Sequence, residues 1–321
     1  MSSTVLRAGL AAQRVARWVR SSASPDLVQA GYRKTLAEYK AKTMLGPFES
    51  VSDVAKELDC LDSEIIPTAR FTIEQQHFTG SGEALTATTK RRNVDDETYA
   101  GLKQTLEMGE TYRPLTIDDF ALFHNAFRST FGLVVLLAIF GTDFRSWYRQ
   151  HAILKAHYRY QVIAYWNPEL GKVELGILIA LAFGGRAAPV CAGRMVTLLR
   201  FLAARLFGLA ILDCTDDCNG LEAQESAASA LVCWKRLQAI IGFQLEDTKE
   251  TIGQRVVIQG VLCDVTDSEM KVNVSPSRAE VLRNEIKSIR AEKCFPPKAA
   301  RKLASKCLFH AAVCLAATAA P

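Results

Sequence analysis

The spacing of apolar residues predicts a chain that contains both helices and strands. Apolar side chains recur at helical spacing over 25–62, with a polar helix at 51–61, and again over 191–206 and 226–241. Two further helices are predicted near the C-terminal end, one opened by the capping box Ser277-Arg-Ala-Glu280 and one starting near residue 297. Alternating or short apolar runs predict strands at 65–78, 160–165, 172–178, 242–249 and 255–263.

Two continuous apolar runs predict buried strands that each end in aspartate. The run 133–140 leads into Asp143, and the run 209–212 leads into Asp216 and Asp217. The breakers Asn219 and Gly220 follow, so we expect a tight hairpin with Asp216 and Asp217 at its tip. An isolated Asp-Asp pair is often only a turn, because its side chains bond nearby backbone. The second strand that ends in Asp favours a shared site.

Carboxylates placed together in this way need a positive partner. Two ionised carboxylates about 4 Å apart repel by roughly 4 kcal/mol at an effective dielectric constant near 20. A bound divalent cation turns that repulsion into attraction, and carboxylate oxygens are ligands of Mg²⁺. The two Asp-bearing strands therefore predict a metal site, provided that they lie side by side.

Composition indicates a globular protein. The chain has 321 residues, of which 49% are hydrophobic and 23% charged, enough for one large domain or two ordinary ones. Nine cysteines without a CxxC pair argue against a disulfide framework and favour reduced thiols inside a cell, in the nucleus or the cytoplasm. No apolar run reaches the ~18 residues that a membrane helix needs, so we expect a soluble protein without a membrane partner. The oligomeric state is unknown from sequence.

The first 25 residues form a basic, amphipathic segment. Arg7, Arg14, Arg17 and Arg20 lie among Ser, Ala and apolar residues, and no acidic residue precedes Asp26. This is the composition of an organelle transit peptide, which would direct the protein to mitochondria. A basic N-terminal helix that belongs to the fold is the alternative.

Positive charge is concentrated in two places, within a formal net charge of +5. The run Lys90-Arg-Arg-Asn-Val-Asp95-Asp96 is either a solvated hairpin edge or a fingertip that holds phosphate through Arg91 or Arg92, whose guanidinium forks match phosphate oxygens. Between Lys271 and Lys306 there are ten Lys or Arg and three Glu. This segment is either a pair of solvated helices or a surface for a phosphate backbone.

Taken in order, these motifs resemble the palm of a reverse transcriptase. Six segments carry the resemblance: Arg91-Arg-Asn-Val-Asp95, Asp143-Phe-Arg-Ser-Trp-Tyr-Arg-Gln, Leu181-Ala-Phe-Gly with Ala188-Pro189, Cys214-Thr-Asp216-Asp217, Gly242-Phe-Gln-Leu with Lys249, and Ile258-Gln-Gly-Val. They cover about residues 66–310. The Phe-Gly form of the third motif is similar to gypsy-like or tyrosine-recombinase-type retroelements.

The resemblance implies an α+β fold, a polymerase right-hand palm whose antiparallel sheet packs on helices, with fingers and a partial helical thumb. An N-terminal helical extension would occupy 1–62 and the fingers 63–142. The palm would occupy 143–265, with finger elements inserted around 155–180, and a partial thumb 266–321. The chain stops inside the expected thumb, as in a C-terminally truncated copy, and whether it belongs to a longer polyprotein stays open.

The resemblance also implies RNA-directed DNA polymerase activity, that is, transfer of a nucleotide from a dNTP to a primer 3′-hydroxyl on an RNA or DNA template. Two Mg²⁺ ions would be held by Asp143, Asp216, Asp217 and the backbone carbonyl of Phe144.

The remaining roles implied by the resemblance concern the nucleotide. Arg91 or Arg92 would hold the triphosphate, and Tyr148 would exclude a 2′-hydroxyl. Phe183 and Gly184 would line the base-pair pocket, and Lys249 could donate a proton to pyrophosphate.

Three residues depart from the family pattern. Cys214 stands in place of Tyr, Ala182 in place of Pro, and Trp147 is bulkier than the small residue expected beside Tyr148. Because overfilling a pocket can abolish activity without unfolding the protein, a catalytically degenerate palm that binds nucleic acid without polymerising is the alternative. A third possibility, an α/β domain with incidental Asp residues, predicts that Asp143 lies more than about 10 Å from Asp216, too far for metals ~3.5–4 Å apart.

Overall fold

The computed structural model describes residues 3–21, 23–79, 86–102, 107, 109–266, 268–291 and 296–316. The chain divides into two compact units, each built from several stretches of sequence. The first comprises 1–77, 89–112 and 146–194, and the second comprises 78–88, 113–145 and 195–321. The boundaries predicted at 62, 142 and 265 remain predictions.

A five-stranded sheet with the order β1-β6-β5-β2-β3 forms the centre of the first unit. Its strands are β1 (Met44–Phe48), β2 (Thr68–Thr79), β3 (Thr86–Asp95), β5 (Val162–Asn167) and β6 (Lys172–Leu178). β2 runs parallel to β5, whereas β5 and β1 are antiparallel to β6. Three short 3-10 turns belong to this unit, η1 (Asp62–Glu64), η2 (Trp147–Gln150) and η3 (Lys155–Tyr160).

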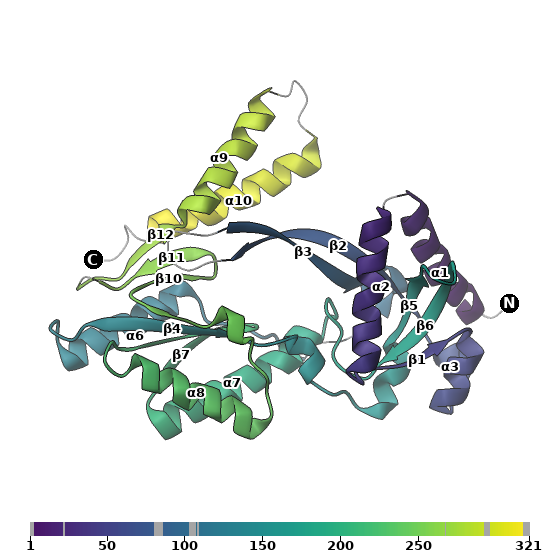
Figure 1. The fold of residues 1–321 in the computed structure, drawn as a ribbon, viewed down its shortest axis with the longest axis horizontal. Coiled ribbons are helices and arrows are strands. Elements are labelled where there is room, and N and C mark those ends of the chain that lie inside the picture. The colour runs from purple at the N-terminus through teal and green to yellow at the C-terminus, as the bar shows by residue number, and fades with distance from the viewer. Residues whose placement is uncertain are drawn as a thin grey trace. The chain divides into compact units, whose positions relative to one another are not determined.

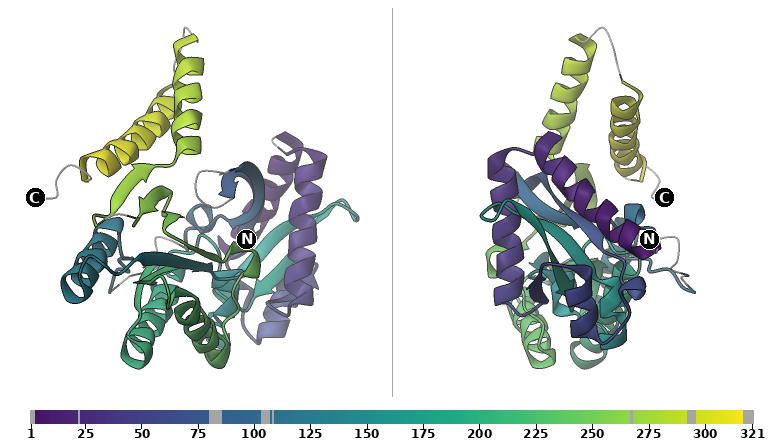
Figure 2. Two further views of the ribbon diagram at one scale, coloured as in Figure 1. Left: turned by 60° about the vertical axis from the view of Figure 1, so that its left-hand side comes forward. Right: turned by 90° about the vertical axis from the view of Figure 1, so that its right-hand side faces the viewer.

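Helices from the N-terminal end complete this unit. They are α1 (Ser3–Ser21), α2 (Pro25–Lys40), α3 (Val51–Leu58) and the short α4 (Glu97–Ala100). α1 lies against β5 and β6, and α2 lies against β5 and β1 (Figure 2). Val15 of α1 is fully buried in one core cluster with Val54, Ile65 and Val162. The basic N-terminal helix is therefore part of the packed unit.

A four-stranded antiparallel sheet with the order β7-β8-β4-β9 forms the centre of the second unit. Its strands are β4 (Leu137–Asp143), β7 (Ala210–Cys214), β8 (Asp217–Ala223) and β9 (Thr251–Gly253). The helices α7 (Ala188–Phe207) and α8 (Ala227–Ile241) lie side by side under it (Figure 1). A third helix, α6 (Ile117–Phe131), contributes Phe120 to the core together with Leu137, Ile139 and Leu212.

The rest of the second unit follows the four-stranded sheet in sequence. A three-stranded sheet consists of β10 (Arg255–Ile258), β11 (Val261–Asp264) and β12 (Lys271–Val274). α9 (Pro276–Ala291) leads away from this sheet, and α10 (Pro297–Ala316) returns to contact β12 (Figure 1). In the described ranges, no helix is long and apolar enough to cross a membrane.

Packing behind the four-stranded sheet holds β4 and β8 in one register. Gly220 lies opposite Phe140, and a β-carbon at Gly220 would come within 2.1 Å of the Phe140 ring. Only glycine therefore lets that ring lie flat on the neighbouring strand. β4 is also bonded to the helix α8: the indole Nε1 of the fully buried Trp234 donates a hydrogen bond to Thr142 Oγ1 at 2.9 Å. Both contacts fix the strand that carries Asp143.

Several predicted elements differ from the observed ones. The strand predicted over 133–140 begins only at Leu137, because α6 and its glycine cap extend to Gly132; Val134 is 93% exposed. Asn219 and Gly220 lie inside β8 and not in the turn. The prediction of one strand at 255–263 was wrong, because Gln259 and Gly260 turn the chain with positive φ between β10 and β11.

Other differences concern single elements. The strand predicted at 242–249 is reduced to one bridge, Phe144 with Leu245, followed by the 3-10 turn η4 (Asp247–Lys249). α9 begins at Pro276, so Ser277 lies inside the first turn and is not a cap. The helix α6 and the strands β1 and β12 were not predicted. The turn predicted after Thr79 lies outside the described residues.

We expect Val15→Asp to destabilise the protein by about 3 kcal/mol or more, because it puts an unpaired carboxylate into the core of the first unit. Gln13→Asp is the matched control, since residue 13 is exposed on the same helix and gains the same charge. Chemical denaturation measures both. Equal unfolding midpoints for the two variants would contradict the buried position of α1.

Candidate active site

Three aspartates meet at one edge of the four-stranded sheet. In the β4–β8 register, Asp143 lies directly opposite Asp217. Cys214 pairs with Asp217, so Thr215, with a φ of 63°, and Asp216 form the two-residue tip of the β7–β8 hairpin. The backbone N–H of Phe144 donates to the carbonyl oxygen of Asp216 at 2.9 Å. Asp143 and Asp216 are thus neighbours and are not on separate faces of the molecule.

The cluster is rich in negative charge and is partly balanced by Lys249. Asp143 is buried, and its carboxylate forms an ion pair with the Lys249 ammonium of η4. Desolvation, a hydrogen bond with Asp143 and the charge of Asp216 all raise the pKa of Asp217. The Asp217 side chain is nevertheless exposed to solvent, so a cation can reach it directly.

The donor set suits a hard cation in its chemistry. Asp143 and Asp217 present carboxylate oxygens from adjacent strands. Burial raises the pKa of Asp217 most, followed by the hydrogen bond with Asp143 and the charge of Asp216, and a divalent cation would offset the charge repulsion. Within the ranges that the structure describes, no three Cys, His, Asp or Glu side chains already surround a common point as a finished metal centre does. The Lys249 ammonium supplies the positive charge in this arrangement.

A fourth aspartate in the same hairpin is excluded from the cluster. Strand alternation places Asp213, paired with Cys218, on the opposite face from Asp217. There the Asp213 carboxylate is 1% exposed and accepts a hydrogen bond from Arg200 of α7 at 2.6 Å. Asp213 therefore ties the strand to its covering helix.

The first unit contains the residues predicted to contact a nucleotide. The Tyr148 and Phe183 rings meet edge to face with centroids 5.9 Å apart, and the Arg92 guanidinium lies 5.4 Å from the Phe183 centroid. Gly184, with a φ of 96°, lies close to the Asp95 carbonyl. Arg92, Phe183 and Tyr148 thus form one row of contacts. Arg91 is not in that row, because its guanidinium pairs with Glu74.

Trp147 does not crowd the Tyr148 side chain. It is 3% exposed and packs edge to face on the His151 ring, with centroids 4.2 Å apart. Ser146, with a φ of 48°, starts the 3-10 turn that sends these neighbouring side chains in different directions. The large Trp147 side chain, which departs from the family pattern, is therefore packed in the protein interior.

One buried cluster in this unit was not predicted from the sequence. Glu38, Arg70, Asp95 and Arg149 form a connected set of ion pairs, with Arg70 and Asp95 almost wholly inaccessible to solvent. Asp95 and Arg149 fall within quoted motifs, but nothing in the sequence links them to Glu38 and Arg70, which lie in a helix and a strand far away in the chain. We call these four residues the ion cluster.

The fold is similar to that of a solved polymerase. The chain matches the structure of the foamy viral protease-reverse transcriptase in complex with double-stranded DNA, with a TM-score of 0.60 and 13% sequence identity. The match covers 88% of this chain and 40% of that chain, so the chain spans less than half the length of that protein. No protein-family model matches the sequence, and no curated protein matches it either.

This likeness confirms the predicted fold class, an α+β fold with a palm-like sheet resembling a reverse transcriptase polymerase. The Phe-Gly retroelement subtype remains a prediction.

We expect Asp217→Asn to raise the melting temperature at pH 8 in the absence of divalent ions. The folded-state pKa of Asp217 is raised above the ordinary value of about 3.9, so the folded protein favours the protonated carboxyl. The stability that this carboxyl contributes is therefore fully present below about pH 3.9 and is lost as pH rises through the folded-state pKa. The difference between variant and wild type should therefore vanish below about pH 4. Thermal unfolding across this pH range measures it.

Mg²⁺ at about ten times its Kd should raise the melting temperature of the wild type by about 3 °C, and the same concentration should raise that of Asp217→Asn by less. Asp247→Asn is the control, since it removes the same charge from a side chain that is 87% exposed. An equal response of all three proteins to Mg²⁺ would refute a cation site at Asp217.

Proposed function

We propose that this protein is an RNA-directed DNA polymerase of a retroelement, which transfers a nucleotide from a dNTP to a primer 3′-hydroxyl. The observation that carries the proposal is the gathering of Asp143, Asp216 and Asp217 at one edge of a palm-like sheet. If the Asp216–Asp217 turn served the fold alone, nothing would require Asp143, 73 residues earlier in the chain, to lie beside it. Phosphoryl transfer between polyanions requires this kind of cation-binding edge.

The cofactor in this proposal is Mg²⁺, in two ions held by Asp143, Asp216, Asp217 and the Phe144 carbonyl. When bound, such ions activate the attacking hydroxyl and neutralise the charge that develops on the leaving pyrophosphate. The chain's own contribution is to hold the carboxylates in register through the β4–β8 pairing. Lys249 carries protons at Nζ beside Asp143 and can give one to the pyrophosphate as it leaves.

The first unit contributes the proposed nucleotide contacts. Of Arg91 and Arg92, Arg92 carries the positive charge for the triphosphate, because it lies beside Phe183 while Arg91 pairs with Glu74. Phe183, with Gly184 beside it, presents an aromatic face to the base pair, and Tyr148, in contact with Phe183, blocks the space of a ribose 2′-hydroxyl. A template with its primer is the proposed partner, held through phosphate contacts by the basic helices α9 and α10.

A degenerate palm that binds nucleic acid without polymerising is the second candidate. It is favoured by the ion pair between Lys249 and Asp143, and by the fact that no three donors in the described residues surround a common point. The two candidates differ in turnover, because both would bind a primed template.

Asp216→Asn should lower primer extension on an RNA template by about 10³-fold or more, because loss of one cation-binding carboxylate removes several kcal/mol of transition-state stabilisation. Asp247→Asn should retain wild-type activity, since its exposed side chain lies outside the cluster. The measurement is incorporation of dNTP in Mg²⁺. Equal background incorporation by wild type and Asp216→Asn, with intact binding of the primed template, would favour the degenerate palm.

Tyr148→Val should increase the incorporation of ribonucleotides relative to deoxynucleotides by about tenfold or more, because it opens space beside Phe183. Tyr160→Val is the control, because Tyr160 is a surface residue on η3, 39% exposed. Competition between dTTP and UTP on one template measures the ratio. An unchanged ratio would remove Tyr148 from the nucleotide site.

A further inference from the structure

Arg149, one residue after Tyr148, lies where the ion cluster meets the loop 179–187, which connects β6 to α7 and carries Phe183 and Gly184. Its Nε donates to Glu38 Oε1 at 2.6 Å, and its Nη2 lies 3.7 Å from Asp95 Oδ2. The remaining arm, Nη1, donates to the backbone carbonyl oxygen of Leu181 at 2.5 Å. One planar guanidinium thus joins a helix, a strand end and the loop that carries Phe183.

The rest of the ion cluster holds the two carboxylates that this guanidinium contacts. Arg70 donates to Asp95 through Nε at 2.7 Å and Nη2 at 3.1 Å, and its Nη1 donates to Glu38 and to Thr35. The Arg70 side chain is 2% exposed and that of Asp95 is 0% exposed. The two acids and two bases compensate one another, so both carboxylates that orient Arg149 are themselves fixed.

Charge balance favours the ionised forms of Glu38 and Arg70 in spite of their burial. Burial by itself would raise the pKa of Glu38, but Arg70 and Arg149 outweigh it and lower that pKa. Burial would likewise lower the pKa of Arg70, but Asp95 and Glu38 raise it.

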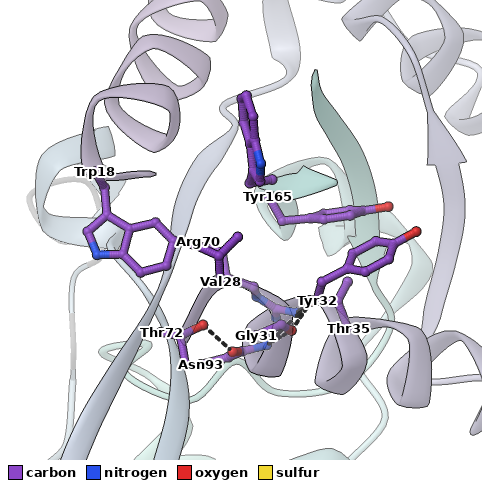
Figure 3. A pocket seen from close by; sticks show the side chains of 10 residues that line it. Trp18, Val28, Gly31, Tyr32, Thr35, Arg70, Thr72, Asn93 and Tyr165 are labelled. Carbon is purple, nitrogen blue, oxygen red and sulfur yellow. Dashed lines mark hydrogen bonds between the residues drawn. The ribbon is translucent and has the colours of Figure 1, made fainter. Parts of the chain in front are cut away.

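A second layer of hydrogen bonds reaches Arg70 through the Thr35 hydroxyl of α2, which accepts from Arg70 Nη1 and from Asn93 Nδ2, both at 3.3 Å. The Thr72 hydroxyl donates to Asn93 Oδ1 at 2.9 Å, and Asn93 Nδ2 donates to the Gly31 carbonyl at 3.1 Å (Figure 3). These groups line a small pocket of about 10 Å³, partly open to solvent, between α1, α2 and the sheet. Because its polar groups bond to one another, we assign the pocket no ligand and regard it as part of the support for Arg70.

The loop is held to the Tyr148 segment through both polar groups of Leu181. The Leu181 N–H donates to the His151 carbonyl at 3.0 Å, and the Leu181 carbonyl accepts from Arg149. Further along, the N–H of Arg186 donates to Glu97 Oε2 at 3.2 Å. The segments that carry the Tyr148 and Phe183 rings are therefore joined by Arg149 and by backbone hydrogen bonds, in addition to the contact between the two rings.

We propose that Arg149 is a positioning residue for nucleotide selection: held by the ion cluster, it fixes Tyr148 against Phe183 and so sets the preference for deoxynucleotides over ribonucleotides. This inference rests on the proposed polymerase function. Arg149 does not contact the nucleotide, and it acts through the Leu181 carbonyl and the η2 turn.

The first test is independent of activity. In Arg149→Met, hydrogen exchange should rise at least tenfold in peptides that cover 146–151 and 180–186, and stay at the wild-type level over β7 and β8. Arg159→Met is the matched control, since Arg159 also pairs with a glutamate of this unit but at the surface, with side chains 34% and 37% exposed. Unchanged exchange in the two segments of folded Arg149→Met would overturn the inference.

The second test measures nucleotide selection by competition between dTTP and UTP on a primed template. Arg149→Met should raise KM for dTTP about tenfold with a smaller change in kcat, and lower the preference for dTTP about tenfold. Arg159→Met should leave both unchanged. In a Tyr148→Val background, Arg149→Met should cause no further loss of preference, because both residues act through the same contact. Independent, additive losses would overturn the positioning role.

Arg149→Lys separates positioning from stability. The variant should fold, because lysine keeps the positive charge beside Glu38. Its compact ammonium, however, cannot bond Glu38 and the Leu181 carbonyl in the fork geometry of a guanidinium. We expect near wild-type thermal stability with the lowered preference of Arg149→Met, and a wild-type preference would overturn the inference. If the wild type extends no primer, the proposed function fails and nucleotide selection with it, while hydrogen exchange still decides whether Arg149 fixes the two segments.

Discussion

The opposition of Asp143 and Asp217 across β4 and β8 is the constraint on which the proposed site depends. The Lys249 ion pair with Asp143 and the raised pKa of Asp217 relieve the repulsion between the two carboxyl groups, but neither holds the strands in register, so other contacts must do so. The Phe140 ring over Gly220 and the Trp234–Thr142 hydrogen bond provide them on the neighbouring positions of the same strands. The register of the sheet is thereby fixed by packing, and the charges follow from the register.

The sequence allowed prediction of those features that lie within a single segment. The Asp-ended apolar runs, the helices 226–241 and 191–206, and the strands 160–165 and 172–178 all have a pattern of their own. The structure contains the corresponding elements, the strand 172–178 with the same ends and the others with shifted ends. The β4–β8 register could be reached only through the order of motifs, because no local pattern says which strands pair. The likeness to a solved reverse transcriptase supports that reasoning for the fold.

Features that depend on contacts between distant segments could not be predicted. Glu38 and Arg70 look like ordinary surface residues of a helix and a strand, and only the fold places them against Asp95 and Arg149. From the sequence, Trp147 is expected to crowd the nucleotide pocket because it is next to Tyr148. In the structure, the turn that begins at Ser146 with a positive φ places the Trp147 side chain in the interior. The exposed residues before β4 were assigned to a strand because hydrophobicity was the only signal available.

The ion cluster is better explained by the orientation that it gives to the loop bearing Phe183 than by a contribution to the free energy of folding. A buried ion pair costs nearly as much in desolvation as it returns in attraction, and apolar side chains of the same volume often stabilise a core equally well. Apolar residues could not, however, bond the Leu181 carbonyl and two carboxylates from fixed directions, as the Arg149 guanidinium does. What the charges add is therefore orientation: they fix the loop bearing Phe183 relative to the turn bearing Tyr148, two segments more than thirty residues apart in the chain.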